Sequence, residues 1–593
     1  MVQIQTLKNR HSRSLALFFC LAALLVFAVA FLFINSNNSL TKKNNVEISQ
    51  QKAESHTVVL GSSTVPFVEG EDYSLPDTVE AEDFSGYVCG NCDNSVSGSM
   101  WLGWNDFEPE RGVYDWSSLE SRLANLAAQG KTGSLHLQSI TTGGYNPDNG
   151  ISVSREVPDW IFTYYDLDPE NLPTVGGTFN ITVIPQWQPE IGGDFNNMVR
   201  ALGEAYADDP RLESIYLHGI SESRGEELWM TQPYLNTIEA DWGLTPTVMY
   251  DWLSARMDAY TEAFAGVEYK VAWVGMGPSW FQGRTDFEGA STNLLYYAWS
   301  KGFGNRNGGI EFYFWHIEQT SWGSTVDDDG YIIIDEDSPN FDGRYWGEEN
   351  EEYGEAWEWR YGSKHSDPYR YRMSVMRALQ ARMRWLWTSE AGEEINPGLS
   401  EYARLSFGKD VYNSPDAWTL LFESPISSYG VDQVRNFERW LLQRDITGGV
   451  TVPSLLYYFD AGAGSYTHYT ARRTDIATGN NYIYFALDDS FIPTDTVQIK
   501  VEMIDNSQTD WHLEYYDNGG ALASTTTISN SNDDRVKTYT FTIHDANFAN
   551  QFDSDMDFRL VNDGPGDLTA RWVRLIRISD TFPPATINDL TAE

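Results

Sequence analysis

Two pairs of glutamates follow apolar segments at separate points of the chain, and their type and placement suit acid chemistry. Glu222 and Glu226 lie in a glycine-containing turn directly after the apolar run 212–217. Glu348 and Glu349 stand together in the segment FDGRYWGEENEEYG. Cleavage of a glycosidic bond commonly uses two carboxyl groups, one to protonate the leaving oxygen and one to attack the sugar or activate water. A solvated, glutamate-rich loop is the alternative interpretation of the segment that holds Glu222 and Glu226.

Strands that alternate with helices would bring the two pairs to one rim. Extended segments are predicted at 99–104, 134–139, 182–188, 212–217, 269–276, 309–317, 343–348 and 417–423. Helical spacing separates most of them, which favours parallel pairing, and eight strands close into a (β/α)8 TIM barrel. The carboxyl ends of the strands form the rim where barrel enzymes keep their active sites. The fourth and seventh strands would each deliver one glutamate pair there.

Two predicted helices determine which segment is the seventh strand and where the barrel domain ends. Apolar residues recur at spacings of three and four through 369–389, so the whole segment is predicted to be one helix. The seventh strand must therefore precede it, which selects 343–348. A last helix at 431–443 follows the eighth strand, and the barrel domain is assigned to residues 65–465.

The sequence pattern changes after the predicted barrel. Residues 466–580 contain short alternating strands with Asn, Asp and Gly turns, which predict a C-terminal β-sandwich. This domain either binds glycan or braces the barrel. Residues 581–593 contain a double proline followed by a strand start, typical of a linker and the opening of a fibronectin type III-like module.

The composition excludes some partners. A formal charge of -45 over 593 residues argues against nucleic acid or an anionic membrane surface as a partner. Aromatic residues make up 14% of the chain, with 22 Trp and 33 Tyr, and exposed aromatic faces are a platform for stacking on sugars. A large aromatic core is the alternative. No cofactor and no metal site are predicted.

The N-terminus carries an export signal. Residues 1–14 form a basic cytoplasmic segment, 15–34 an uninterrupted apolar run, and 35–64 a polar flexible linker. A run of 20 residues is long enough to cross a bilayer of about 30 Å, which predicts a transmembrane signal anchor. A cleaved signal peptide is the alternative, because Ala28 and Ala30 form an Ala-x-Ala site. Both place the rest of the chain outside the cytoplasm, anchored or secreted, with membrane contact through this segment alone.

Cys89 and Cys92 form a lone C-x-x-C motif. In an exported chain a local disulfide is favoured over a redox or zinc role, which would need further ligands.

Aromatic and polar residues at the predicted strand ends would line the cleft. The candidates for substrate binding are Trp104, Gln138, Trp187, Trp273, Trp315 and His316. Core packing is the alternative role for each tryptophan.

One longer motif carries a family resemblance. The segment WNDFEPERGVYDWSSLESRLANLAAQGK, residues 104–131, resembles the first strand, loop and helix of the large barrel clan of glycoside hydrolases that includes β-galactosidases and agarases. The resemblance implies an acid/base after strand four, a nucleophile after strand seven and a retaining mechanism. A closer likeness is to secreted bacterial barrel proteins of unassigned function, which have a Gly-Glu-Trp-Gly-Glu-like turn after strand four and a Gly-Glu after strand seven. Ser221 stands where the clan usually has Asn.

These observations predict a glycoside hydrolase acting on an extracellular polysaccharide or its oligosaccharides. Glu222 is assigned as acid/base and Glu348 as nucleophile, with Glu226 and Glu349 as alternates. A non-catalytic glycan-binding surface protein on a barrel scaffold is the competing hypothesis.

Overall fold

The computed structural model describes most of the chain beyond residue 69. The described residues are 70–83, 85–89, 95–146, 151–153, 155–175, 181–220, 228, 230–275, 281, 283–306, 310, 322–350, 367–388, 394–424, 434–454, 470–494 and 496–578. None of the helices within these ranges is long and apolar enough to cross a membrane. The predicted segments 1–14, 15–34 and 35–64 lie outside them.

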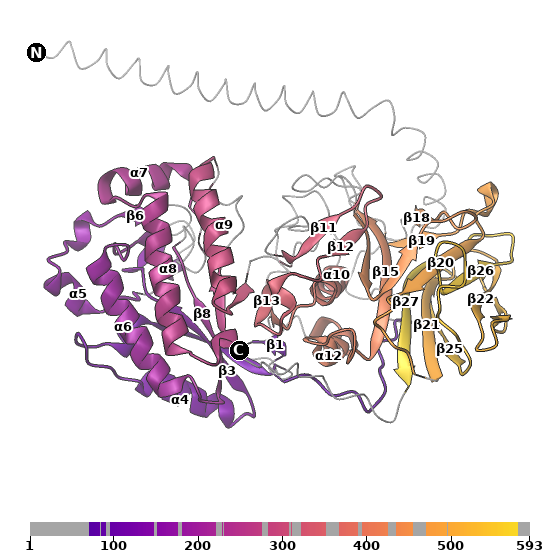
Figure 1. Ribbon diagram of the computed structural model, residues 1–593, viewed down its shortest axis with the longest axis horizontal. Coiled ribbons are helices and arrows are strands. Elements are labelled where there is room, and N and C mark those ends of the chain that lie inside the picture. The colour runs from indigo at the N-terminus through magenta and orange to yellow at the C-terminus, as the bar shows by residue number, and fades with distance from the viewer. Residues whose placement is uncertain are drawn as a thin grey trace, which may run out of the picture.

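Eight parallel strands close into a barrel, which confirms the predicted fold class (Figure 1). Their order around the barrel is β1-β14-β13-β10-β9-β8-β3-β2. In chain order β8 is the fourth strand and β13 the seventh, as predicted for the strands that carry the glutamate pairs. The bounds are β1 Gly86–Val88, β2 Ser97–Gly103, β3 Thr132–Gln138, β8 Leu212–Leu217, β9 Val271–Val274, β10 Gly304–Arg306, β13 Trp346–Asn350 and β14 Trp385–Thr388.

Helices connect most of these strands and pack against their outer faces. Local capping fixes where several begin and end: the Thr245 side chain accepts from the backbone N–H of Val248 at the start of α8, and Gly243, with φ 72°, ends α7. Thr245 and Asn396 also precede a proline in the first turn, where a missing N–H costs nothing. The bounds are α3 Trp104–Phe107, α4 Ser117–Ala127, α5 Asp159–Tyr164, α6 Pro189–Tyr206, α7 Gln232–Trp242, α8 Pro246–Ala263, α9 Thr285–Ser300, α10 Asp367–Gln380 and α12 Pro397–Ser406.

Two of the predicted barrel strands lie outside the barrel, and its first strand was not predicted. That first strand is the short β1. The predicted third strand, 182–188, contributes only β7 (Ile181–Thr182), which pairs antiparallel with β6 (Thr174–Val175) outside the barrel. The predicted eighth strand is β15 (Asp416–Ser424), an antiparallel strand of the C-terminal sheets. The omission of β1 and the error at 182–188 cancel, so the fourth position still falls on β8.

The predicted helix 369–389 is in fact a helix and a strand. Helix α10 ends at Gln380, and Arg382 takes the left-handed conformation, with φ 56°. The backbone N–H of Met383 donates to the carbonyl of Ala378, closing the helix end. The last barrel strand, β14, begins three residues after Arg382. Glycine usually occupies such a turn, so an arginine there conceals the break.

The predicted helix 431–443 is also wrong. It forms β16 (Val434–Arg439) and β17 (Leu441–Arg444), which belong to two different sheets. Trp440 joins them with φ 58°, so the chain turns a corner at one residue. The predicted end of the barrel at residue 465 is therefore too late, because strands from β15 onward lie in the C-terminal sheets.

Two antiparallel sheets form the C-terminal region, consistent with the predicted β-sandwich. One has the order β16-β15-β27-β19-β18, with β21 joining β27 to β25; the other has the order β17-β20-β26-β22-β23, with β24 on β22. The further bounds are β18 Val452–Ser454, β19 Ala471–Arg473, β20 Tyr482–Leu487, β21 Thr496–Ile504, β22 Asp510–Tyr516, β23 Leu522–Ser524, β24 Ile528–Ser529, β25 Val536–Ile543, β26 Phe558–Asn562 and β27 Thr569–Ile578.

The barrel and the sandwich share one core. A single cluster of buried residues includes Trp346 of the barrel, Tyr402 of α12 and Trp572 of β27. Beside it, Arg372 of α10 pairs with Glu502 of β21 and with Glu71, and all three side chains are at most 3% exposed. Figure 1 shows α10 and α12 lying between the barrel strands and the sandwich. An apolar core with a buried ion network fixes the two parts to each other.

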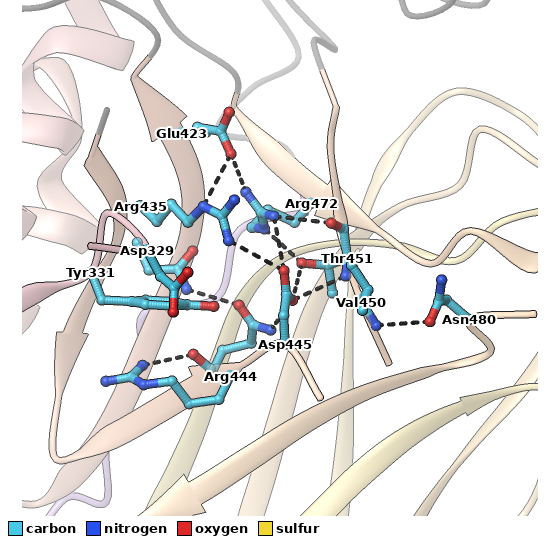
Figure 2. A network of polar contacts seen from close by, with 12 residues as sticks. Asp329, Tyr331, Glu423, Arg435, Arg444, Asp445, Val450, Thr451, Arg472 and Asn480 are labelled. Carbon is cyan, nitrogen blue, oxygen red and sulfur yellow. Dashed lines mark hydrogen bonds and ion pairs between the residues drawn. The ribbon is translucent and has the colours of Figure 1, made fainter. Parts of the chain in front are cut away.

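The hairpin of β11 (Ser324–Val326) and β12 (Ile332–Ile334) packs on the sandwich. Tyr331 forms a bridge with Arg435 of β16, and the Arg444 guanidinium lies 4.2 Å from the Tyr331 ring centre. Below them, Arg472 and Arg435 lie between the carboxylates of Glu423 and Asp445 (Figure 2). The β11–β12 hairpin is therefore attached to the sandwich through Tyr331.

Candidate active site

Side chains alternate across each barrel strand, which decides what faces the interior. Ser97, Ser134 and Ser214 come from β2, β3 and β8, and their hydroxyls hydrogen-bond to one another at 2.9 Å inside the barrel. Met100 and Leu135, on the other parity, belong to the core between strands and helices. The interior positions are thus known along each strand.

Further up the same three strands, an aromatic row crosses the interior. The Trp101 and His136 rings stack at 3.9 Å, and His136 and Tyr216 stack at 4.0 Å. His136 is fully buried, and burial, with His218 and Arg306 nearby, holds the pKa of its imidazole well below the usual range. The ring is therefore neutral at physiological pH.

The mouth of the barrel carries charge beside aromatic faces. Trp387 of β14 lies 5.5 Å from Trp101, and the Arg306 guanidinium lies 5.4 Å from the centre of the Trp387 ring. Trp101 and Trp387 are both partly exposed, whereas Arg306 is fully buried. Stacking surfaces thus lie next to a buried cation at the carboxyl ends of the strands.

Glu349 pairs with the buried Arg306. The ion pair is made by the Glu349 carboxylate, and the Glu349 side chain is 15% exposed. In the strand register Glu349 is opposite Trp387, which faces the interior. The alternate of the seventh-strand pair therefore faces the barrel interior.

Glu348 lies on the other side of β13. It is fully buried and is opposite Leu386, which packs in the core outside the barrel with Trp346. The backbone N–H of Glu349 donates to its carboxylate at 3.3 Å. The sequence-based preference for Glu348 over Glu349 is corrected because strand alternation turns Glu348 away from the interior.

The fourth-strand pair, Glu222 and Glu226, lies outside the described residues. The described chain ends on this side with His218 and Ile220, just beyond β8. Arg256 of α8, fully buried, donates to the carbonyl of His218 at 3.2 Å and to the side chain of Gln186. Phe195 and Trp252 cover its guanidinium. A helix side chain thus holds the backbone just beyond the carboxyl end of β8.

A third carboxyl group is buried at the same end of the barrel. Glu156 accepts from the backbone N–H groups of Ile140 and Thr141, just beyond β3, at 3.3 and 3.1 Å. Its backbone packs against Gly103, the last residue of β2, where a Cβ would lie 2.9 Å from the Glu156 Cα. Burial raises the pKa of its carboxyl to about 8. Glu156 is therefore protonated at neutral pH.

Three of the predicted substrate-binding residues are core residues instead. Trp104, Trp187 and Trp273 belong to the cluster between the barrel strands and the helices and are 0, 4 and 1% exposed. The Trp104 indole N–H donates to Glu108, and that of Trp187 to the carbonyl of Trp242. Gln138 ends β3 on the interior parity and is partly exposed, and its role in substrate binding stays a prediction. Trp315 and His316 lie outside the described residues.

Cys89, immediately after β1, is disulfide-bonded. Its predicted partner, Cys92, lies outside the described residues. Across the part of the chain that the structure describes, no group of three or more His, Cys, Asp or Glu side chains is placed to hold a metal ion.

Sequence reasoning missed Trp101, His136, Arg306 and Trp387. Alternation in SGSMWLG and TGSLHLQ, segments 97–103 and 132–138, assigns Trp101 and His136 to one side once Met100 and Leu135 are taken as outward. Trp387 lies within the predicted helix 369–389, so it was not considered as a residue of a barrel strand. Arg306 lies just before the predicted strand 309–317. The first two could have been found from the sequence.

Comparison with known proteins finds matches among solved structures alone. No family model and no curated protein matches the chain. The catalytic domain of a β-amylase from Paenibacillus polymyxa matches with a TM-score of 0.33 and 10% identity, covering 52% of this chain and 91% of that one. A β-galactosidase from Marinomonas ef1 matches with 0.29 and 12%, covering 53% and 55%. An exo-β-1,4-mannosidase from an Opitutaceae bacterium matches with 0.32 and 11%, covering 56% and 62%. Similarity at this level does not determine an activity.

Proposed function

We propose that this protein is a glycoside hydrolase that cleaves an extracellular polysaccharide or its oligosaccharides. The observation that carries the proposal is the Arg306–Glu349 ion pair, set beside Trp101 and Trp387 at the carboxyl-terminal mouth of a parallel barrel. Active sites of such barrels are built at this end. Aromatic faces beside a carboxylate suit a sugar ring, whose C–H face stacks while its anomeric carbon meets the acid.

Glu349 is assigned as the nucleophile. A nucleophilic carboxylate attacks the anomeric carbon to form the glycosyl-enzyme intermediate. The Glu349 carboxylate pairs with the Arg306 guanidinium on the neighbouring strand, and this buried partner holds it at the barrel interior.

The acid/base is assigned to the turn after β8, to Glu222 with Glu226 as alternate. Two strands, β9 and β10, separate β8 from β13 in the barrel, so an acid that follows β8 would approach a bound sugar from a different side than Glu349. A retaining mechanism, in which the acid/base first protonates the leaving oxygen and then activates water, completes the proposal. The N-terminal apolar segment would hold the enzyme at the outer face of the membrane or direct its secretion.

Paired glutamine variants test the assignment. Glu349→Gln keeps the shape of the side chain and removes the nucleophile, so turnover of a glycan panel should fall by about 10³-fold or more. Glu348→Gln is the matched control next to it, outside the barrel interior. Equal turnover in wild type and Glu349→Gln would refute the assignment. Binding without turnover by wild type would favour the competing hypothesis of a glycan-binding protein.

Glu222→Gln and Glu226→Gln separate the two candidates for acid/base. Loss of the acid slows substrates with poor leaving groups much more than activated aryl glycosides. The variant with that selective loss identifies the acid. Anomeric configuration of the product, followed by NMR, distinguishes retention from inversion.

A further inference from the structure

A cavity lies at the opposite end of the barrel from Glu349. Its volume is about 380 Å³, within the range of small-molecule sites. Arg344 and Arg384 line it from just before β13 and β14, at the amino-terminal ends of the strands. Trp440, at the corner between β16 and β17, closes it from the sandwich side. The cavity is thus formed jointly by barrel and sandwich.

Four cations line this cavity in a chain whose net charge is -45: Arg344, Arg382, Arg384 and Lys409. Arg382 pairs with Glu336 and Lys409 with Glu82, whereas the contact of Arg344 with the exposed Asp342 is longer, at 3.8 Å. Arg344 and Arg384 therefore determine which charged ligand the cavity can bind.

Arg344 and Arg384 are held mainly by backbone carbonyls. Arg344 donates to the carbonyl of Trp299 at 2.6 Å, and its nearest carboxylate, Asp342, is 3.8 Å away and 71% exposed. Arg384 donates to the carbonyl of Asp83 at 2.9 Å. Among the described residues Arg384 has no ion pair within 4.0 Å. Burial lowers the pKa of both guanidinium groups, a sign that their charge is poorly solvated.

The carboxylates that line the cavity bind other groups. Glu336 pairs with Arg382, and Asp410 accepts from the backbone N–H groups of Tyr412 and Asn413 at 2.8 and 3.0 Å. Asp488 accepts from the N–H of Ser490 at 2.8 Å. The two arginines therefore retain charge and donors for an anion that enters.

Exposed aromatic side chains lie at this cavity and at a neighbouring one. Tyr412 lines it and is 55% exposed. A neighbouring cavity of about 440 Å³ is lined by Tyr296, 51% exposed, and by Trp299, whose carbonyl Arg344 binds. Pro339 lines this neighbour and the adjacent Asn340 lines the first cavity. Cationic donors in one cavity, with exposed rings in it and in its neighbour, suit an anionic group carried on a sugar chain.

We propose that this cavity is a non-catalytic binding site for a saccharide that carries carboxylate or sulfate groups. Arg344 and Arg384 bind the anionic group, and Tyr412 and Tyr296 stack on neighbouring sugar units. The saccharide part rests on the proposed function, whereas the anion part does not. Bound there, an acidic polymer stays with the protein while the barrel mouth releases products.

Calorimetric titration of the folded protein tests the site. The probes are trigalacturonate, a sulfated galactose trisaccharide and neutral galactotriose, with inorganic sulfate as the bare anion. One or both acidic trisaccharides should bind at least 10-fold more tightly than the neutral one and than sulfate, and added NaCl should weaken them. Equal affinity for acidic and neutral trisaccharides overturns the proposal, as does equal affinity for the acidic trisaccharides and sulfate.

Variants locate the binding. Arg384→Ala and, independently, Arg344→Gln should each raise the Kd for the acidic probe 10-fold or more. Arg200→Ala is the control, because Arg200 is an exposed arginine paired with Glu262 on the barrel helices. Circular dichroism checks that each variant is folded. If one arginine variant fails to fold, the other still tests the site. Unchanged binding in either folded variant overturns the proposal.

Glu349→Gln distinguishes this site from the barrel mouth. The variant should bind the acidic probe as wild type does, although its turnover is lost. Loss of binding in Glu349→Gln would place the probe at the barrel mouth and overturn the proposal. Absence of turnover in wild type would refute the proposed function and leave the anion titration to be judged by the arginine variants.

Discussion

Arg306 and Glu349, from the adjacent strands β10 and β13, form an ion pair inside the barrel mouth, with the guanidinium fully buried and the carboxylate 15% exposed. A buried charge that loses its partner destabilises the fold much more than an exposed one. The pair therefore contributes to stability as well as to the proposed chemistry.

A double-mutant cycle should reveal this coupling. Glu349→Gln leaves the Arg306 guanidinium buried without its counter-charge, while Arg306→Met together with Glu349→Gln removes both charges. We expect a coupling free energy of about 1–3 kcal/mol from chemical denaturation. Arg200→Ala combined with Glu349→Gln is the control and should be additive within about 0.5 kcal/mol. A coupling near zero would contradict the pairing.

Glu156 should make stability fall as pH rises. The pKa of its carboxyl is raised to about 8 in the folded protein, so the folded state holds a proton that the unfolded state has released. The contribution of Glu156 to the free energy of unfolding is fully present below the pKa of the carboxyl in the unfolded chain, near 4.3. It is lost as pH rises through the folded-state pKa of about 8, at up to about 1.4 kcal/mol per pH unit. Glu156→Gln, which stays neutral, should unfold at a higher temperature than wild type at pH 9 and at a similar one at pH 4.5. Parallel curves for the two proteins would show that Glu156 is not buried as described.

His136 should make stability fall as pH decreases, the opposite of the effect of Glu156. Its pKa is depressed by burial, so the unfolded state takes up a proton below about pH 6.5 that the folded state refuses. Its contribution is present above that pH and is lost as pH falls. His136→Phe keeps a ring between Trp101 and Tyr216, and its melting temperature relative to wild type should rise progressively from pH 7 to pH 5. His512→Phe, at a partly exposed histidine of β22, is the control. A pH-independent difference for His136→Phe would contradict the buried, neutral state.

Arg472 should be among the most sensitive positions of the sandwich. It is fully buried, pairs with Glu423 and donates to the Thr451 hydroxyl at 2.7 Å (Figure 2). Arg472→Met would leave two carboxylates with Arg435 as their remaining partner, and we expect a loss of about 3–5 kcal/mol in the free energy of unfolding. Arg404→Met, which removes an exposed pair with Glu401, should cost at most about 1 kcal/mol. Similar losses in both variants would argue against the buried network.

The sequence predicted the barrel and its fourth and seventh strands because alternating strand and helix patterns are strong over most of the domain. It failed where one residue redirects the chain. Arg382 and Trp440 both adopt left-handed conformations without being glycine, so neither break carries its usual marker. Periodic apolar residues continued across both positions and favoured helices.

The site shows the same limit. Glu348 and Glu349 are neighbours, and the choice between them depends on which parity of β13 faces inward. Placing the strand at 343–348 rather than at Trp346–Asn350 put the first glutamate at its end. The side of the strand on which each tryptophan lies determines whether it can contact a substrate. Trp104 and Trp273 pack beneath helices, whereas Trp101, three residues before Trp104, faces the barrel interior. Sequence alone contains no measure of which side a helix will cover.

The first described residues, Gly70 and Glu71, lie against the sandwich, although the barrel comes before it in sequence. Thr538 of β25 donates to the carbonyl of Gly70 at 2.6 Å, and Glu71 joins the ion network with Arg372. A force applied through the residues before Gly70 would therefore load the sandwich and α10 first. The barrel strands, with Arg306 and Glu349 at their far end, would be shielded from that tension.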